Sequence, residues 1–424
     1  MNPTRSVLAS VGLNGTAAPI LVARILALAC GLVTALVSSS SLGAQGRGEL
    51  VGFAILQLFA STGLGFGTGV AAYVVVGTDR HEGEAVAGAV AAWALVVFLA
   101  TAAVAAVAGA VGLLDLALGS SSPFIVTALA AGASGQYASI AWTQLVMGLG
   151  RSRLTAAGFA IAPVAVCICS MVVASVSPSS HAFMAAQVGG WLAAAMVMMI
   201  VADIRPTWRP ATLARLVRRG RSAMLGDMAN SLVYRLDALL LGLLGGTAAV
   251  GVYSLAVQVL EPVWTFASAV AAGLLVTFRD RPERLWAAMT ARSAFVVTAV
   301  STFGAIAVLV VLPYIVSIVG SQFDRSIPAA AALAPGIVLL SAAKVLAAFQ
   351  LASGRLWASS AIATATLVVT IVLDVLLIPS FGALGAAIAS SIAYGVAAAA
   401  WLIAFRHWSS ATSSAAPPAR VNQG

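Results

Sequence analysis

The chain has 424 residues, of which 61% are hydrophobic and only 8% are charged, and its mean hydropathy is +1.04. Soluble domains carry about 25% charged residues, so this composition excludes an ordinary water-soluble protein and predicts an integral membrane protein. The net charge of +9 does not indicate nucleic-acid binding, because the arginines are spread over short loops between apolar segments.

Apolar segments long enough to cross a membrane follow one another along the whole chain, since a spanning helix needs about 20 residues. The predicted spans are residues 17–38, 50–76, 86–114, 121–149, 154–177, 182–203, 222–244, 248–277, 287–315, 327–352, 357–379 and 383–405. The sequence therefore predicts an all-α, polytopic membrane protein with about twelve transmembrane helices.

The distribution of basic residues predicts the orientation of these spans. Sixteen arginines fall on one side of the predicted topology, and only Arg47 and Arg325 fall on the other. Cytoplasmic loops carry an excess of Lys and Arg, so both termini are predicted to be cytoplasmic.

The predicted spans form two similar halves. Gly43 and Gly48 match Gly246 and Gly251 at an offset of 203 residues. Because each half contains an even number of spans, the repeats should be parallel and related by a pseudo-twofold axis along the membrane normal.

The repeat gives a predicted domain organisation. Residues 1–203 form a first six-helix lobe, 204–221 a basic cytoplasmic linker, 222–405 a second six-helix lobe, and 406–424 a disordered tail. The linker fits either a short basic helix on the anionic leaflet or a solvated connection.

Several ionisable groups lie inside the predicted spans, where each costs about 2.5–3.5 kcal/mol if it faces lipid. We expect Arg24, Arg235 and Lys344 to be cavity cations that bind the substrate. The polar and acidic residues expected to line the same cavity are Asp227, Asn230, Tyr234, Asp237, Gln258, Glu261 and Asp374. The alternative is that these charges pair as buried salt bridges without any role in transport.

No catalytic, metal or cofactor site is expected. Lys344 is the only lysine and follows two alanines, which excludes a phosphate-binding loop of the Walker type. His81, His181 and His407 are isolated at predicted span ends, which disfavours a metal site. We therefore expect a protein that is not an enzyme.

Three segments carry a family resemblance. Residues 42–49 (LGAQGRGE) close the first span, residues 235–237 (RLD) precede residues 251–254 (GVYS), and residues 374–387 (DVLLIPSFGALGAA) link the last two spans. Together they resemble the polysaccharide-biosynthesis flippases, the O-antigen and exopolysaccharide exporters related to multidrug-and-toxin extruders. Asp374 departs from the family pattern, in which Asn is frequent, and this leaves open a proton- or cation-sensing role.

The resemblance implies two six-helix lobes around a central cavity that opens alternately to each leaflet. The implied cargo is an undecaprenyl-pyrophosphate-linked oligosaccharide moved from the inner to the outer leaflet, and the implied location is the bacterial cytoplasmic (inner) membrane. Implied partners are this lipid-linked glycan, membrane lipids, a glycan polymerase and glycosyltransferases, with a monomer as the expected state and no nucleic acid.

Two other functions fit the sequence less well. A multidrug exporter of the same fold would move cations, and its relatives carry an acidic residue in the first span, where this chain has Arg24. A membrane-embedded glycan polymerase or ligase would need a large extracytoplasmic loop, which the predicted topology lacks.

Overall fold

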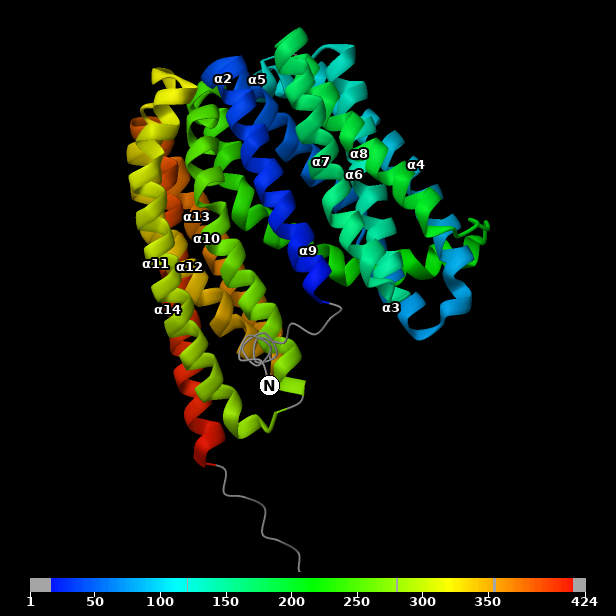
Figure 1. Ribbon diagram of the computed structural model, residues 1–424, viewed down its shortest axis with the longest axis vertical. Helices are drawn as coiled ribbons and strands as arrows, with labels where there is room; N and C mark the ends of the chain where they lie inside the picture. Colours follow the sequence, from blue (N-terminus) through cyan, green and yellow to red (C-terminus); the bar gives the residue numbers. More distant parts are fainter. Residues whose placement is uncertain (1–16, 120, 280, 354–355, 415–424) are drawn as a thin grey trace, which may run out of the picture.

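The computed structural model describes residues 17–414 apart from positions 120, 280 and 354–355. All regular structure in this part of the chain is helical (Figure 1). The first half contains α2 (Ala17–Leu64), α3 (Thr68–Thr78), η1 (Arg80–Glu82), α4 (Gly83–Ala110), α5 (Leu113–Leu118), α6 (Pro123–Gly148), α7 (Ser152–Val176) and α8 (Ser180–Ala202). The second half contains α9 (Pro210–Gly245), α10 (Thr247–Arg279), η2 (Glu283–Leu285), α11 (Trp286–Val319), η3 (Ser321–Phe323), α12 (Ser326–Ala352), α13 (Leu356–Phe381) and α14 (Ala383–Ser414).

The predicted fold class is confirmed. Ten helices of the described residues are long and apolar enough to cross a membrane. One of them, α2, contains the first predicted span and the first part of the second, joined at Gly43, where φ is 69°. The second predicted span, residues 50–76, is broken after Leu64 and continues in the separate helix α3. Helix α9 contains the seventh predicted span, and the other nine predicted spans each coincide with one helix.

The helices of the two halves begin at equivalent positions. Pairs that start 203 residues apart are η1 and η2 (Arg80, Glu283), α4 and α11 (Gly83, Trp286), α6 and α12 (Pro123, Ser326), and α8 and α14 (Ser180, Ala383). Their packing repeats as well, since the neighbours α4–α6, α6–α8 and α7–α8 recur as α11–α12, α12–α14 and α13–α14. The offset read from the glycines is therefore a repeat of the architecture.

The bends at the equivalent positions Gly43 and Gly246 have the same backbone conformation. Their φ/ψ angles are 69°/−176° and 83°/166°. Residues with a side chain rarely adopt these angles, so glycine is required at both positions. Each glycine ends a helix that crosses the protein and begins the next one.

The two halves touch where α2 crosses α10 just after these bends. A Cβ atom at Gly48 would overlap the carbonyl of Thr247, and one at Gly251 would overlap the carbonyl of Ala44. Ala44 and Gly48 are the repeat equivalents of Thr247 and Gly251, so the contact is self-complementary, as at a two-fold axis. Small residues allow this close approach of two backbones inside a membrane.

The outward surface of the bundle is apolar. On α11, the side chains of Phe303 and Ile318 are 76% and 81% exposed, and large apolar residues of α4 such as Val104 and Val107 are also exposed. Such continuous apolar faces on neighbouring turns of long helices match a lipid-facing surface.

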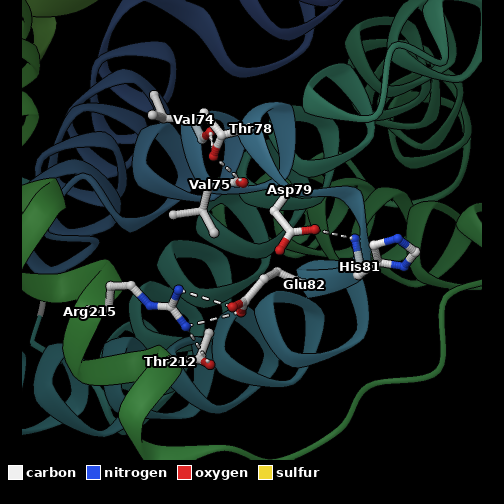
Figure 2. Close-up of polar contacts among 8 residues, drawn as sticks. All are labelled: Val74, Val75, Thr78, Asp79, His81, Glu82, Thr212 and Arg215. Atoms are coloured by element: carbon white, nitrogen blue, oxygen red, sulfur yellow. Dashed lines mark hydrogen bonds and ion pairs between the residues drawn. The ribbon is translucent and has the colours of Figure 1, made fainter.

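The larger part of the predicted basic linker, residues 210–221, is the beginning of a long helix rather than a separate element. Helix α9 runs without interruption from Pro210 through the linker and the seventh span. Its first turns pack on the first half: Leu216 is fully buried, and Arg215 forms a two-pronged ion pair with Glu82 at 3.0 and 3.1 Å (Figure 2). Residues 210–221 are therefore not the solvated connection that the sequence left open as one alternative. The lobe boundary at residue 221 stays a prediction.

The predicted disordered tail, residues 406–424, includes the last turns of a helix. Residues 406–414 continue helix α14, because Trp408 packs with Trp401 and Phe405 in an apolar cluster. Helix propensity and this packing outweigh the polar composition of the segment. The rest of the predicted tail, residues 415–424, lies outside the described residues.

The α2–α10 crossing predicts a strong effect of small substitutions. Gly48→Ala and Gly251→Ala should each lower the free energy of unfolding by roughly 1–3 kcal/mol, because the added methyl group meets backbone that cannot move away. Gly189→Ala is the matched control, since a Cβ atom there meets nothing within 4 Å in helix α8. Thermal unfolding of the purified variants measures the difference, and equal midpoints for all three would contradict the described contact.

Candidate functional site: a cationic cavity between the halves

A cavity of about 310 Å³ lies between the two halves, next to the α2–α10 crossing. Helices α2, α6, α7 and α8 form its wall from the first half, and α9 and α10 close it from the second half. Its prominent polar and aromatic lining residues are Arg47, Gln136, Gln187, Trp191, Arg235 and Gln258. The cavity therefore contains two guanidinium groups and three amides.

Arg47 is a cavity residue that the sequence analysis assigned to an outer loop. Helix α2 resumes directly after Gly43, so Arg47 lies inside a helix and is only 5% exposed. One Nη atom donates to the Ser38 hydroxyl at 2.6 Å, while Nε has no partner among the described residues. The internal repeat could have placed Arg47 inside a helix. The predicted eighth span begins at residue 248, and the equivalent position 203 residues earlier precedes Arg47, so the second span should already include Arg47.

Arg235 is the predicted cation that the structure places on the cavity wall. Its Nη2 atom lies 3.7 Å from a Glu261 oxygen, and Gln258 donates to the other oxygen of Glu261 at 3.0 Å. The Arg235 side chain keeps 32% of its surface exposed, so the ion pair leaves part of the guanidinium open to the cavity. Arg235 and Arg47 line the same cavity, so their positive charges repel each other there.

Lys344 and Arg24 lie against aromatic rings and are not among the cavity-lining residues. The Lys344 ammonium donates to the Tyr234 hydroxyl at 2.9 Å and lies 4.6 and 4.8 Å from the ring centres of Tyr234 and Trp264. The Arg24 guanidinium lies 4.6 Å from the ring centre of Phe159 on α7. Neither cation forms an ion pair with an acid of the described residues. Ring faces stabilise cations in this way, and sequence spacing gives no sign of such partners.

The structure places Asp237 and Asp374 inside the second half rather than on the cavity wall. Asp237 is 3% exposed and accepts hydrogen bonds from the Tyr253 hydroxyl, from Ser390 at 2.9 Å and from the Ala238 amide at 2.7 Å. Asp374 is fully buried, and neither of its oxygens has a hydrogen-bond partner in the described part of the chain. The side chains of Asp227 and Asn230 lie outside what the structure describes.

A chain of three amides extends from the cavity into the first half. Gln187 donates to Gln57 at 3.3 Å, and Gln57 donates to Gln136 at 3.0 Å, which links α8, α2 and α6. These three residues were not among the predicted cavity residues, because isolated glutamines in apolar spans have no partner that sequence spacing would show. Together with Trp191, Gln136 and Gln187 give the first-half wall of the cavity neutral groups, whereas the second half contributes Arg235, which pairs with Glu261.

Comparison with known proteins gives one family and a consistent fold. Residues 85–328 match the family described as "Polysaccharide biosynthesis protein". A search of curated proteins found no match.

Solved structures of two kinds share the fold. A multidrug resistance MATE family transporter of the MOP superfamily, solved in an inward-facing conformation, has a TM-score of 0.75 at 14% identity, covering 92% of this chain and 96% of that one. The lipid II flippase MurJ, in an inward closed conformation, has a TM-score of 0.72 at 12% identity and covers 92% and 87%. An outward-facing MATE family transporter scores lower, 0.65 at 14% identity with coverage of 95% and 97%. At such identities the likeness concerns the fold, and it is greater for the inward-facing form.

The two buried acids should respond in opposite ways to neutralisation. Asp237→Asn disturbs an acceptor that serves three donors and should destabilise the protein by roughly 1–3 kcal/mol. Asp374→Asn removes a buried carboxyl group without partners and should leave the unfolding midpoint unchanged or raise it. Thermal unfolding in detergent compares the two, and a larger loss for Asp374→Asn would show that the Asp374 carboxylate has a stabilising partner.

Proposed function

The chain belongs to the polysaccharide biosynthesis protein family, and on that premise we propose that it is a flippase for lipid-linked oligosaccharides. Its cargo would be an undecaprenyl-pyrophosphate-linked glycan, moved from the inner to the outer leaflet of the cytoplasmic membrane by alternating access. The observation that carries this proposal is the pair of arginines, Arg47 and Arg235, in the cavity between the halves.

The two arginines suit a pyrophosphate. Arginine binds phosphate oxygens through paired N–H groups, and such charge-assisted bonds are stronger away from bulk water. Among the described residues, the Nε atom of Arg47 has no partner and Arg47 forms no ion pair, and Arg235 shares one acid, Glu261, with Gln258. Two neighbouring cations with one carboxylate leave net positive charge, which an anionic cargo would neutralise.

The other wall suits a glycan. Gln136 and Gln187 offer both donors and acceptors, which sugar hydroxyls require, and Trp191 offers a flat apolar surface for a sugar ring. Arg24 and Lys344 remain proposed contacts for the cargo on its way through the cavity, because aromatic rings rather than carboxylates hold both cations.

The proposed orientation places the arginine-rich loops and both termini in the cytoplasm. The start of α2, the end of α14 and the turn between α3 and α4 all lie toward the lower part of Figure 1. The α2–α10 crossing would then lie toward the outer side, with the cavity between it and the cytoplasm.

The second candidate is an exporter of cationic drugs, which the likeness to a multidrug resistance MATE family transporter favours. Arg47 and Arg235 oppose it, because a cationic cargo would meet two like charges in a site of low dielectric constant. Expression in a drug-sensitive strain separates the two functions, since only the exporter predicts increased resistance to cationic drugs.

Neutralising the cavity arginines tests the flippase proposal. Arg47→Gln and Arg235→Gln should each reduce glycan export by roughly tenfold or more, since each removes charge-assisted hydrogen bonds to the cargo. Arg47→Lys and Arg235→Lys should keep partial export because they keep the charge. Surface glycan in a strain that lacks its own flippase, corrected for the amount of protein in the membrane, measures the effect.

The controls separate binding from folding. Arg292→Gln removes an exposed arginine of helix α11 that does not line the cavity, and it should export normally. If Arg235 only balances Glu261, the double variant Arg235→Gln, Glu261→Gln should recover export. Normal export by stable Arg47→Gln and Arg235→Gln variants would rule the proposal out.

A further inference from the structure

A second concave surface, the linker groove, shares no lining residue with the cavity and lies where the first turns of α9 meet the break between α2 and α3. It encloses about 520 Å³. Its apolar wall includes Phe66, Trp93, Trp208 and Val217, and two arginines, Arg218 and Arg221, also line it. The proposed transport function uses none of these residues.

The opposite face of helix α9 packs on the first half of the protein and holds the linker groove in place. A Cβ atom at Gly220 would overlap the carbonyl of Phe66, so the α9 backbone lies directly on the α2–α3 break. On that side Leu216 is buried and Arg215 turns toward Glu82, as Figure 2 shows. The helix is therefore fixed along one side, and the groove keeps its shape.

The residues on the open side follow helical spacing. Ala214, Val217, Arg218 and Arg221 are separated by three, one and three positions, which puts them on one stripe of α9. Arg218 and Arg221 are both exposed, and neither forms an ion pair with an acid of the described residues. The stripe thus presents two cations beside an apolar surface.

The aromatic residues of the groove are of the kind found at a membrane surface. Trp208 is 59% exposed, and Phe66 is 36% exposed and packs edge-on against Trp93 with ring centres 6.1 Å apart. Tryptophan is enriched where the hydrocarbon region meets the headgroups. In the proposed orientation this end of the protein faces the cytoplasmic leaflet, which carries anionic lipids.

We propose that the linker groove binds one anionic phospholipid of the cytoplasmic leaflet. An acyl chain lies along Phe66, Trp93, Trp208 and Val217, and the phosphate group pairs with Arg218 and Arg221. A soluble phosphate would leave the apolar wall bare, and an uncharged lipid would leave both arginines without a counter-charge. Only an anionic lipid satisfies both parts of the surface.

The site connects lipid composition to the transport helix. Arg235 of the cavity lies on α9, four to five turns after Arg218 and Arg221. A lipid in the groove would hold the first turns of α9 against the first half of the protein. Binding therefore favours the arrangement of the halves described here.

Binding of two defined lipids to the purified full-length protein tests the proposal. Native mass spectrometry in a neutral detergent should show tighter binding of dioleoyl phosphatidylglycerol than of dioleoyl phosphatidylcholine. An arginine near an anionic headgroup contributes enough for roughly a fivefold change in affinity, so Arg218→Gln and Arg221→Gln should each weaken phosphatidylglycerol binding about fivefold, and together about thirtyfold. Phosphatidylcholine binding should be unchanged.

The matched control is the double variant Arg153→Gln, Arg205→Gln, which loses the same charge from two exposed arginines on the same predicted side, outside the groove. It should keep the preference for phosphatidylglycerol. The proposal fails if the wild-type protein does not distinguish the lipids, if both double variants lose the preference equally, or if millimolar glycerol 3-phosphate displaces the lipid. Because no transported cargo is involved, the result does not depend on the flippase proposal.

Discussion

The close approach of α2 and α10 at Gly48 and Gly251 is the contact on which the rest of the architecture depends. Two glycines allow two backbones to touch, and the repeat makes the contact nearly symmetric, so the two halves meet there in a self-complementary junction. The first turns of α9 make a separate contact with the first half. Beside this junction the equivalent bends at Gly43 and Gly246 send the chain back through the membrane. The helices then diverge from the junction, and the cavity lies in the space that they leave.

The charged side chains of the cavity explain why it is suited to an anionic cargo. A guanidinium inside a membrane persists when it has a partner or faces an aqueous cavity. In the described part of the chain, Arg47 donates a hydrogen bond to the Ser38 hydroxyl and forms no ion pair, and Arg235 pairs with a Glu261 that it shares with Gln258. The other two cations predicted to line the cavity, Arg24 and Lys344, contact the faces of aromatic rings. Among the described residues, two cations line the cavity, one acid, Glu261, pairs with Arg235, and the acids Asp237 and Asp374 are buried away from the cavity, so the cavity keeps a positive charge.

Apolar length and the glycine offset predicted the spans and the repeat, because these depend on the membrane and on backbone geometry alone. The position of Arg47 was predicted wrongly, since residues 42–49 look like a loop although Gly43 alone makes the turn. Asp237 and Tyr234 share one polar arc of the seventh span, yet Asp237 points into the bundle and Tyr234 contacts Lys344. Helical spacing shows that a face is polar, but it does not show whether a cavity or another helix covers that face.

The central claim is that the cavity recognises the phosphates of a lipid-linked cargo, and direct binding tests it most simply. The affinity of the purified protein for undecaprenyl pyrophosphate can be compared with its affinity for undecaprenol, which has the same chain and no charge. The account predicts clearly tighter binding of the pyrophosphate and loss of that difference in the double variant Arg47→Gln, Arg235→Gln. Equal binding of both lipids, or a difference that survives in the double variant, would contradict it.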